Sequence, residues 1–180
     1  MGASCFFIGH REAGAAVFPV LAEAVEQHIA EYSVTDFFVG HYGGFDGLAA
    51  QAVKEARERH PEIRLSLVLP YHPAIRPINT PKGFDGTFYP WEDEKIPKRL
   101  AIIKTNQRMV DTCDYLITYA YHFLGGTGQI VEYAKKREKR GLIHIENLAE
   151  KLRENAWGDC PSGTVATLLH WNILSKKLPL

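Results

Sequence analysis

The sequence predicts an α/β fold, in which a doubly wound parallel sheet of about five strands carries helices on both faces. Short segments that are apolar throughout alternate along the chain with longer segments whose apolar residues recur at helical spacing. Right-handed crossovers between such strands lead to the strand order 3-2-1-4-5. With 180 residues, of which 46% are hydrophobic, the chain is long enough for a single domain over residues 1–180.

Five short segments are expected to form the strands. Each is rich in β-branched, aromatic or aliphatic residues, which is typical of strands buried on both faces. The five segments are residues 4–8, 36–39, 65–69, 115–119 and 142–145.

Four helices are expected between these strands. They cover about residues 17–29, 45–56, 97–111 and 129–140. Pro19 lies in the first turn of the first helix, and Asp46 is placed to cap the second helix or to stabilise its start by charge. In the third helix, Leu100 and Val110 belong to the apolar stripe. The fourth helix stops at Gly141, which supplies a left-handed C-terminal turn.

Two regions fall outside this alternation. Residues 71–96 contain four prolines and several aromatic residues, including Trp91, so we expect an ordered flap that closes over a ligand. Residues 146–180 are expected to form a helical extension, with one helix over 164–176. That helix would cover a sheet edge or pair with a second subunit, which makes a homo-oligomer an expected assembly.

The composition argues against several classes of partner. Lys and Arg number 21, as do Asp and Glu, so no overall field attracts the chain to nucleic acid, which we do not expect as a partner. No apolar run is long enough to cross a bilayer, and the first residues lack the basic start of a secretory signal. The three cysteines show no C-x-x-C spacing, which favours a reducing, cytoplasmic setting.

Glycine-rich segments follow three of the expected strands. In an open α/β sheet, ligands bind beyond the carboxyl ends of the strands, where glycine lets backbone N–H groups approach an anion. Together the segments predict a site for phosphate, although any one of them alone reads equally well as an ordinary turn. No P-loop and no G-x-G-x-x-G motif occurs, which argues against ATPase and dehydrogenase functions. The predicted ligand contacts are Gly9, His10, Arg11, Gly40, Gly43, Gly44, Phe45, Asp46, Asn106, Gly125, Gly126, Thr127 and Gly128.

Several polar side chains in these segments have two interpretations. Arg11 would pair with a phosphate through its fork of donors, or form a surface ion pair with Glu12. Asp46 would accept a ribose hydroxyl, or cap the helix that follows it. Four histidines also follow strands, but without metal-ligand spacing we expect hydrogen bonding and neither a metal site nor a cofactor. These histidines are His10, His41, His72 and His122.

Four segments carry a resemblance to a known family. They are Cys5-Phe6-Phe7-Ile8-Gly9-His10-Arg11, Gly43-Gly44-Phe45-Asp46, Asn106-Gln107-Arg108-Met109-Val110-Asp111, and Gly125-Gly126-Thr127 with Val131-Glu132-Tyr133-Ala134. They resemble the SLOG superfamily, and within it the YpsA-like branch, over about residues 4–145. The resemblance implies a Rossmann-like domain that binds or senses a nucleotide or nucleotide-derived phosphorylated ligand, such as ADP-ribose or a nucleoside monophosphate.

A second branch of that superfamily implies an alternative function. The segment from Gly125 to Glu132 is similar to the P-G-G-x-G-T-x-x-E signature of the LOG phosphoribohydrolases, with Leu124 in place of proline and Gln129 in place of threonine. In that case Glu132 and Arg108 would be the catalytic residues of a nucleotide N-glycosidase that releases the base through an oxocarbenium-like transition state. Otherwise Glu132 would pair with a lysine along its own helix.

The single-stranded DNA-binding DprA group is a more distant resemblance. Its counterpart here would be the basic run at residues 135–140. On a helix these side chains spread around the circumference and end at the C-terminus, where cations complement the helix dipole. We therefore interpret the run as a solvated face.

Overall fold

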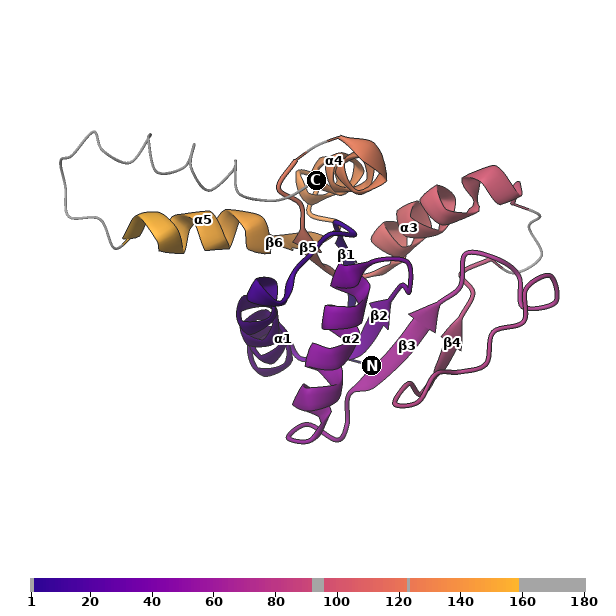
Figure 1. The fold of residues 1–180 in the computed structure, drawn as a ribbon, viewed down its shortest axis with the longest axis horizontal. Helices are drawn as coiled ribbons and strands as arrows, with labels where there is room; N and C mark the ends of the chain where they lie inside the picture. The colour runs from indigo at the N-terminus through magenta and orange to yellow at the C-terminus, as the bar shows by residue number, and fades with distance from the viewer. Residues whose placement is uncertain (1, 92–95, 123, 159–180) are drawn as a thin grey trace.

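The computed structural model describes residues 2–91, 96–122 and 124–158, with side chains described as far as residue 154. Within this part of the chain the strands form one parallel sheet of six strands in the order β4-β3-β2-β1-β5-β6 (Figure 1). The predicted fold class and the relative order of the five expected strands are confirmed. The strands are β1 Ala3–Gly9, β2 Val34–Val39, β3 Arg64–Val68, β4 Gly86–Phe88, β5 Tyr115–Tyr119 and β6 His144–Asn147.

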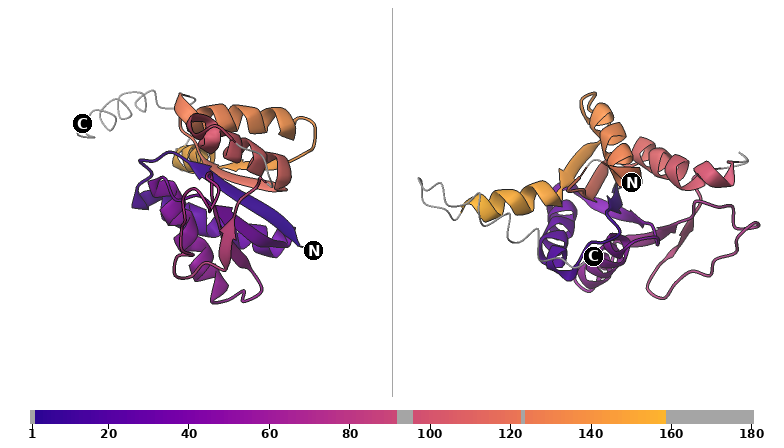
Figure 2. Two further views of the ribbon diagram at one scale, coloured as in Figure 1. Left: turned by 90° about the vertical axis from the view of Figure 1, so that its right-hand side faces the viewer. Right: turned by 45° about the horizontal axis from the view of Figure 1, so that its top comes forward.

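Helices cover both faces of the sheet. Figure 2 shows α1 and α2 on one side and α3 and α4 on the other, as expected of a doubly wound sheet. The helices are α1 Phe18–Tyr32, α2 Gly44–Arg57, α3 Ala101–Thr112, α4 Gly125–Glu138 and α5 Leu148–Gly158, with short 3-10 turns at Ala15–Val17 and Lys98–Leu100.

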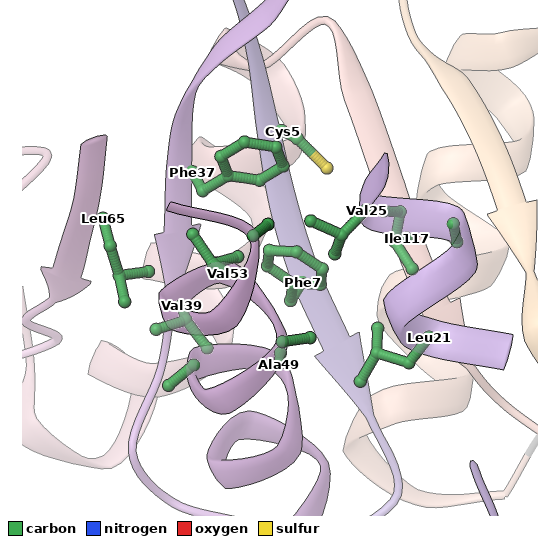
Figure 3. Packing of buried hydrophobic residues seen from close by; sticks show 14 of the residues in the cluster. Cys5, Phe7, Leu21, Val25, Phe37, Val39, Ala49, Val53, Leu65 and Ile117 are labelled. Carbon is green, nitrogen blue, oxygen red and sulfur yellow. The ribbon is translucent and has the colours of Figure 1, made fainter. Parts of the chain in front are cut away.

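The main core lies between the sheet and helices α1 and α2 (Figure 3). Phe7 on β1 and Phe37 on β2 stack with their ring centroids 5.9 Å apart, and both are fully buried. Leu21 of α1 and the small Ala49 of α2 pack against these strands, because one apolar stripe of each helix faces the sheet. This packing holds the ends of β1 and β2 in fixed positions.

A second core lies between the sheet and helices α3 and α4. It contains Phe6, Ile8 and Leu116 from the strands, with Met109 from α3 and Ile130 from α4. The two helices are also tied together by the Tyr133 hydroxyl, which donates to Asp111 Oδ1 at 2.7 Å, and by the ion pair of Arg137 with Asp111. This layer covers β1 and β5, while Phe38 on β2 and Phe88 on β4 stay partly exposed.

The expectation that residues 71–96 contain no strand is wrong. Strand β4 lies in this region and extends the sheet beyond β3. The Leu69 N–H donates to the Phe88 carbonyl oxygen at 2.8 Å, and the Asp85 N–H donates to the Leu65 carbonyl oxygen at 2.9 Å. A strand of three residues is too short to show a period of two in its sequence, so only its partner strand reveals it.

Several element boundaries differ from the expected ones. Strand β6 begins two residues later than predicted, and Leu142 is 44% exposed in the turn before it. Gly141 has the expected left-handed backbone, with φ of +67°, and the Leu142 N–H closes the turn on the Arg137 carbonyl oxygen at 3.1 Å. Helix α4 begins four residues earlier, so the predicted glycine segment forms its first turn. Leu100 is 38% exposed rather than packed in the core.

Helix α5 falls within the predicted C-terminal extension and packs its first residue, Leu148, into the main core. The helix predicted at 164–176 lies outside the described residues. Cys5 and Cys113 are buried free thiols, and burial raises the pKa of Cys113 to about 12. In the described part of the chain, no helix has the length and apolar character needed to span a membrane.

Candidate functional site

The three glycine-rich segments meet at the ends of β1, β2 and β5, which we call the carboxyl edge. The Gly44 N–H donates to the Arg11 carbonyl oxygen at 2.9 Å, which joins the start of α2 to the segment after β1. On the other side, Thr127 Oγ1 donates to the Gly9 carbonyl oxygen at 3.2 Å and joins α4 to the same segment. Because β1 lies between β2 and β5, its following segment is held from both sides.

Two of the glycines are required by packing. A Cβ atom on Gly9 would lie 2.4 Å from Cγ of the Phe45 ring, and one on Gly44 would lie 2.7 Å from the Arg11 carbonyl oxygen. Real Cβ atoms do not approach other atoms this closely. At these two positions glycine serves the close approach of α2 to β1 and its loop.

The glycines that begin α4 have open surroundings. A Cβ atom on Gly125 or Gly126 would have no other heavy atom within 4 Å beyond its chain neighbours and its own helix backbone. Gly125 also has a left-handed φ of +82°, which disfavours other residues there. Leu124, the N-cap, makes no side-chain hydrogen bond to the first turn and is 80% exposed. The first turn of α4 therefore has open space beside these two glycines, and its N-cap residue supplies no side-chain hydrogen bond to the first N–H groups.

Asp46 and Phe45 have structural roles at the start of α2. Asp46 Oδ2 accepts a hydrogen bond from the Tyr42 N–H at 2.9 Å, so the carboxylate reaches back across the N-terminus of the helix. Burial raises the pKa of Asp46. Phe45 is fully buried against Gly9, and its ring stacks 6.2 Å from that of Tyr119. Direct contact of these two residues with a ligand stays a prediction.

His10 is buried at the end of β1. Its Nε2 accepts a hydrogen bond from the His122 N–H at 3.4 Å, which places its own proton on Nδ1. Burial and the neighbouring His122 lower the pKa of His10. The other two predicted histidines also follow strands but are not part of this contact. His41 lies against Tyr42 after β2, and His72 lies against Tyr89 after β3. Within the described residues, no group of three or more His, Cys, Asp or Glu side chains is placed to hold a metal ion.

The flap contacts α2 and α3. Trp91 Nε1–H donates to Oγ1 of the buried Thr105 at 3.1 Å, and the Arg108 guanidinium lies over the Trp91 ring at 6.0 Å. Near its middle, Asp85 forms an ion pair with Arg57 of α2 at 2.5 Å. Closure of the flap over the carboxyl edge stays a prediction.

In the described part of the chain, no polar interaction joins the predicted catalytic pair. Glu132 and Arg108 are both exposed on different helices, and no hydrogen bond or ion pair links them. Asn106, on the same helix as Arg108, is half-buried. Arg11 is exposed and, among described residues, forms no ion pair with Glu12, so its guanidinium is available to a ligand.

Sequence reasoning missed Tyr121 at this edge. Its side chain is 47% exposed, and its ring lies 4.3 Å from His10. The available signal was an alternation of aromatic residues, Tyr119 and Tyr121, at the end of a buried strand and before a glycine-rich segment.

Two hollows of the surface lie away from the glycine-rich segments, one along β1–β4 beside the end of α3 and the other at the amino edge of β5 and β6. The larger has a volume of about 560 Å³ and is lined by Ser4, Arg64 and Phe88, among others. The smaller, of about 400 Å³, is lined by residues that include Asp114 and His144. Neither of these two hollows is lined by a residue of the glycine-rich segments.

No family model matches the chain, and no curated protein matches its sequence. Among solved structures, DNA processing protein A from Helicobacter pylori aligns with a TM-score of 0.54 and 15% identity over 98% of this chain and 82% of that chain. The fold is Rossmann-like. Two further alignments have lower TM-scores. DNA processing protein A (DprA) from Streptococcus pneumoniae aligns at 0.46, with 12% identity over 85% of this chain and 62% of that chain. The Moco carrier protein from Chlamydomonas reinhardtii aligns at 0.45, with 13% identity over 87% of this chain and 96% of that chain.

The Helicobacter pylori protein is described as having a unique single-stranded DNA binding mode. This description does not fit our expectation that nucleic acid is not a partner. Because an identity of 15% shows a shared fold alone, the binding experiment below includes an oligonucleotide.

Proposed function

We propose that this protein binds a nucleotide or nucleotide-derived phosphorylated ligand at the carboxyl edge, with a phosphate at the first turn of α4. The observation that carries the proposal is the open space above Gly125 and Gly126 at an N-terminus without a side-chain cap. Backbone N–H groups there are free to donate, and the helix dipole favours negative charge.

The neighbouring segments support this position for the ligand. The loop after β1 is tied to α4 through Gly9 and Thr127, and it carries Arg11, which has no ion-pair partner among the described residues. The resemblance of these segments to the YpsA-like branch of the SLOG superfamily favours sensing of a nucleotide-derived ligand. We propose that the protein belongs to the YpsA-like branch.

The variant Gly126→Ala tests the proposal directly. The added methyl group meets no protein atom, so the thermal unfolding midpoint should equal or exceed that of the parent chain. The methyl group would, however, obstruct a phosphate at the first turn, and calorimetric affinity should fall about tenfold or more, the loss of a charge-assisted hydrogen bond. Gly86→Ala, whose methyl group also meets no protein atom but lies on β4, should bind as the parent does.

The ligand panel is AMP, ADP-ribose, NAD, ribose 5-phosphate and a single-stranded oligonucleotide. A true ligand at 100 times its dissociation constant should add about 2.7 kcal/mol to the unfolding free energy. A flat response to every phosphorylated small molecule would contradict the proposal. Binding of the oligonucleotide alone would replace it with a nucleic-acid function.

Base release is the remaining alternative, and it rests on Glu132. AMP, the nucleoside monophosphate of the panel, should bind saturably without release of adenine. Turnover in the parent chain that Glu132→Gln abolishes would instead identify an N-glycosidase.

A further inference from the structure

Tyr121 lies two residues beyond β5 and is 47% exposed, yet its ring contacts three other aromatic rings. The ring centroid lies 4.3 Å from that of His10, 4.8 Å from His122 and 5.6 Å from Tyr119. These contacts restrict a side chain that on a free loop would exchange among rotamers. Part of the ring is therefore both rigid and open to solvent.

The support behind Tyr121 continues into the core. The His10 N–H donates to the Tyr119 carbonyl oxygen at 3.0 Å, and the His10 ring lies 3.9 Å from that of His122. The Tyr119 ring in turn stacks on Phe45, which is fully buried. We call these five residues the aromatic cluster. Because each of these rings packs against at least one other, binding to the cluster costs little conformational entropy.

The exposed part of the cluster suits an uncharged planar group. Burial and the neighbouring His122 lower the pKa of His10, so its imidazole is neutral near pH 7. Glu12 is the acidic group whose charge acts on His10, and it lies on the loop after β1. An aromatic surface of this kind binds other flat rings through stacking rather than through ion pairing.

The position of Tyr121 relates it to the phosphate site. It follows β5 at the point where β1 and β5 are neighbours and their chains continue to opposite faces of the sheet. Four residues later, Gly125 begins the open first turn of α4. A phosphate at that turn would leave the rest of a nucleotide beside the same loop.

We propose that the exposed ring of Tyr121 is the stacking surface for the base of the bound nucleotide, an inference that rests on the proposed function. Every base has a π-face, so stacking tolerates base identity. The site therefore distinguishes nucleotides from sugar phosphates more strongly than it distinguishes one base from another.

Calorimetry on the full chain with AMP and ribose 5-phosphate tests this role. The parent chain should bind AMP at least about fivefold more tightly, the lower end of what base–aromatic stacking contributes. Tyr121→Ala should abolish this difference and leave the affinity for ribose 5-phosphate unchanged. Tyr121→Phe should retain the preference, because it keeps the ring. Phe88→Ala, which removes a partly exposed ring on β4, should behave as the parent does.

The outcomes separate the two proposals. If the parent chain binds no phosphorylated small molecule of the panel, the proposed function is wrong. If it binds only ADP-ribose or NAD, Tyr121→Ala should weaken that binding at least about fivefold, and an unchanged affinity would contradict stacking. If ribose 5-phosphate binds but AMP gains nothing, or if Tyr121→Ala keeps the AMP preference, the stacking role is wrong while phosphate binding stands. Loss of the preference in Tyr121→Phe as well would also contradict stacking and would point to the hydroxyl group.

Discussion

The two edges of the sheet differ in shape and in chemistry. The amino edge of β5 and β6 holds a hollow of about 400 Å³, whereas the carboxyl edge of β1, β2 and β5 holds the convergent glycine segments. In a parallel sheet the connecting helices begin at the carboxyl edge and end at the amino edge, so their positive ends gather at the former. Basic side chains in the last turns of α2 and α4, such as Arg57 and Arg137, complement the negative ends at the latter. Chain direction therefore favours the carboxyl edge, rather than a surface hollow, as the place where the proposed anion site is expected.

The largest expected effect is a difference in stability between two variants. One removes a buried ring at the carboxyl edge, and the other removes a ring that lines the hollow of about 560 Å³. Phe45→Ala should lower the free energy of unfolding by about 3–5 kcal/mol, because it empties a fully buried ring position. Phe88→Ala, at 36% exposure, should cost about 1 kcal/mol or less. Urea denaturation of both variants measures the difference. Equal costs would mean that β4 is packed as firmly as α2.

The same substitution at two glycines of the carboxyl edge should destabilise the fold at one position and not at the other. Gly44→Ala places a methyl group against the Arg11 carbonyl oxygen and should cost about 1–3 kcal/mol of stability. Gly126→Ala should cost no stability, because nothing opposes its methyl group. Thermal unfolding of the two variants checks this contrast. A destabilised Gly126→Ala would show that the first turn of α4 is already occupied by protein atoms.

Acid should weaken the fold through histidines whose pKa is lowered in the folded chain, two of which, His10 and His28, are buried. The pKa values of His10, His28 and His41 are lowered in the folded chain, chiefly by burial. The unfolded chain therefore takes up protons first as the pH falls through about 6.5, and stability declines between about pH 7 and 5.

Asp46 acts in the opposite direction. Its raised pKa favours proton uptake by the folded chain at lower pH.

Urea denaturation at several pH values tests the histidine effect. The free energy of unfolding should change less steeply with pH in His28→Gln than in the parent chain. An unchanged slope would mean that His28 takes up its proton without unfolding.

The smallest expected effect concerns the surface charges. Arg59 pairs with Glu26 near the amino edge, and Arg59→Ala should cost about 0.2–1 kcal/mol while leaving ligand affinity unchanged. Arg11→Ala should leave stability unchanged but weaken the binding of the phosphorylated ligand several-fold. Calorimetry and denaturation on the two variants provide the comparison. Weaker ligand binding in Arg59→Ala would move the site to the amino edge.

Elements with a strong local signal could be predicted from the amino-acid sequence alone. A continuous apolar run predicted β1 and β5, helical spacing predicted α1, and Gly141 marked a left-handed turn because few other residues adopt that backbone. The convergence of the glycine segments also followed, since parallel strands bring their carboxyl ends to one edge.

The side chains that meet across the carboxyl edge could not be predicted in this way and became known from the folded structure. His10 and His122 are 112 residues apart, and no periodicity records that they touch or that Tyr121 rests on them. The same holds for Phe45, whose burial depends on the absence of a side chain at Gly9, and for β4, which needs β3 as a template. Contacts between distant segments arise from the packing of the whole chain, so local sequence patterns do not predict them.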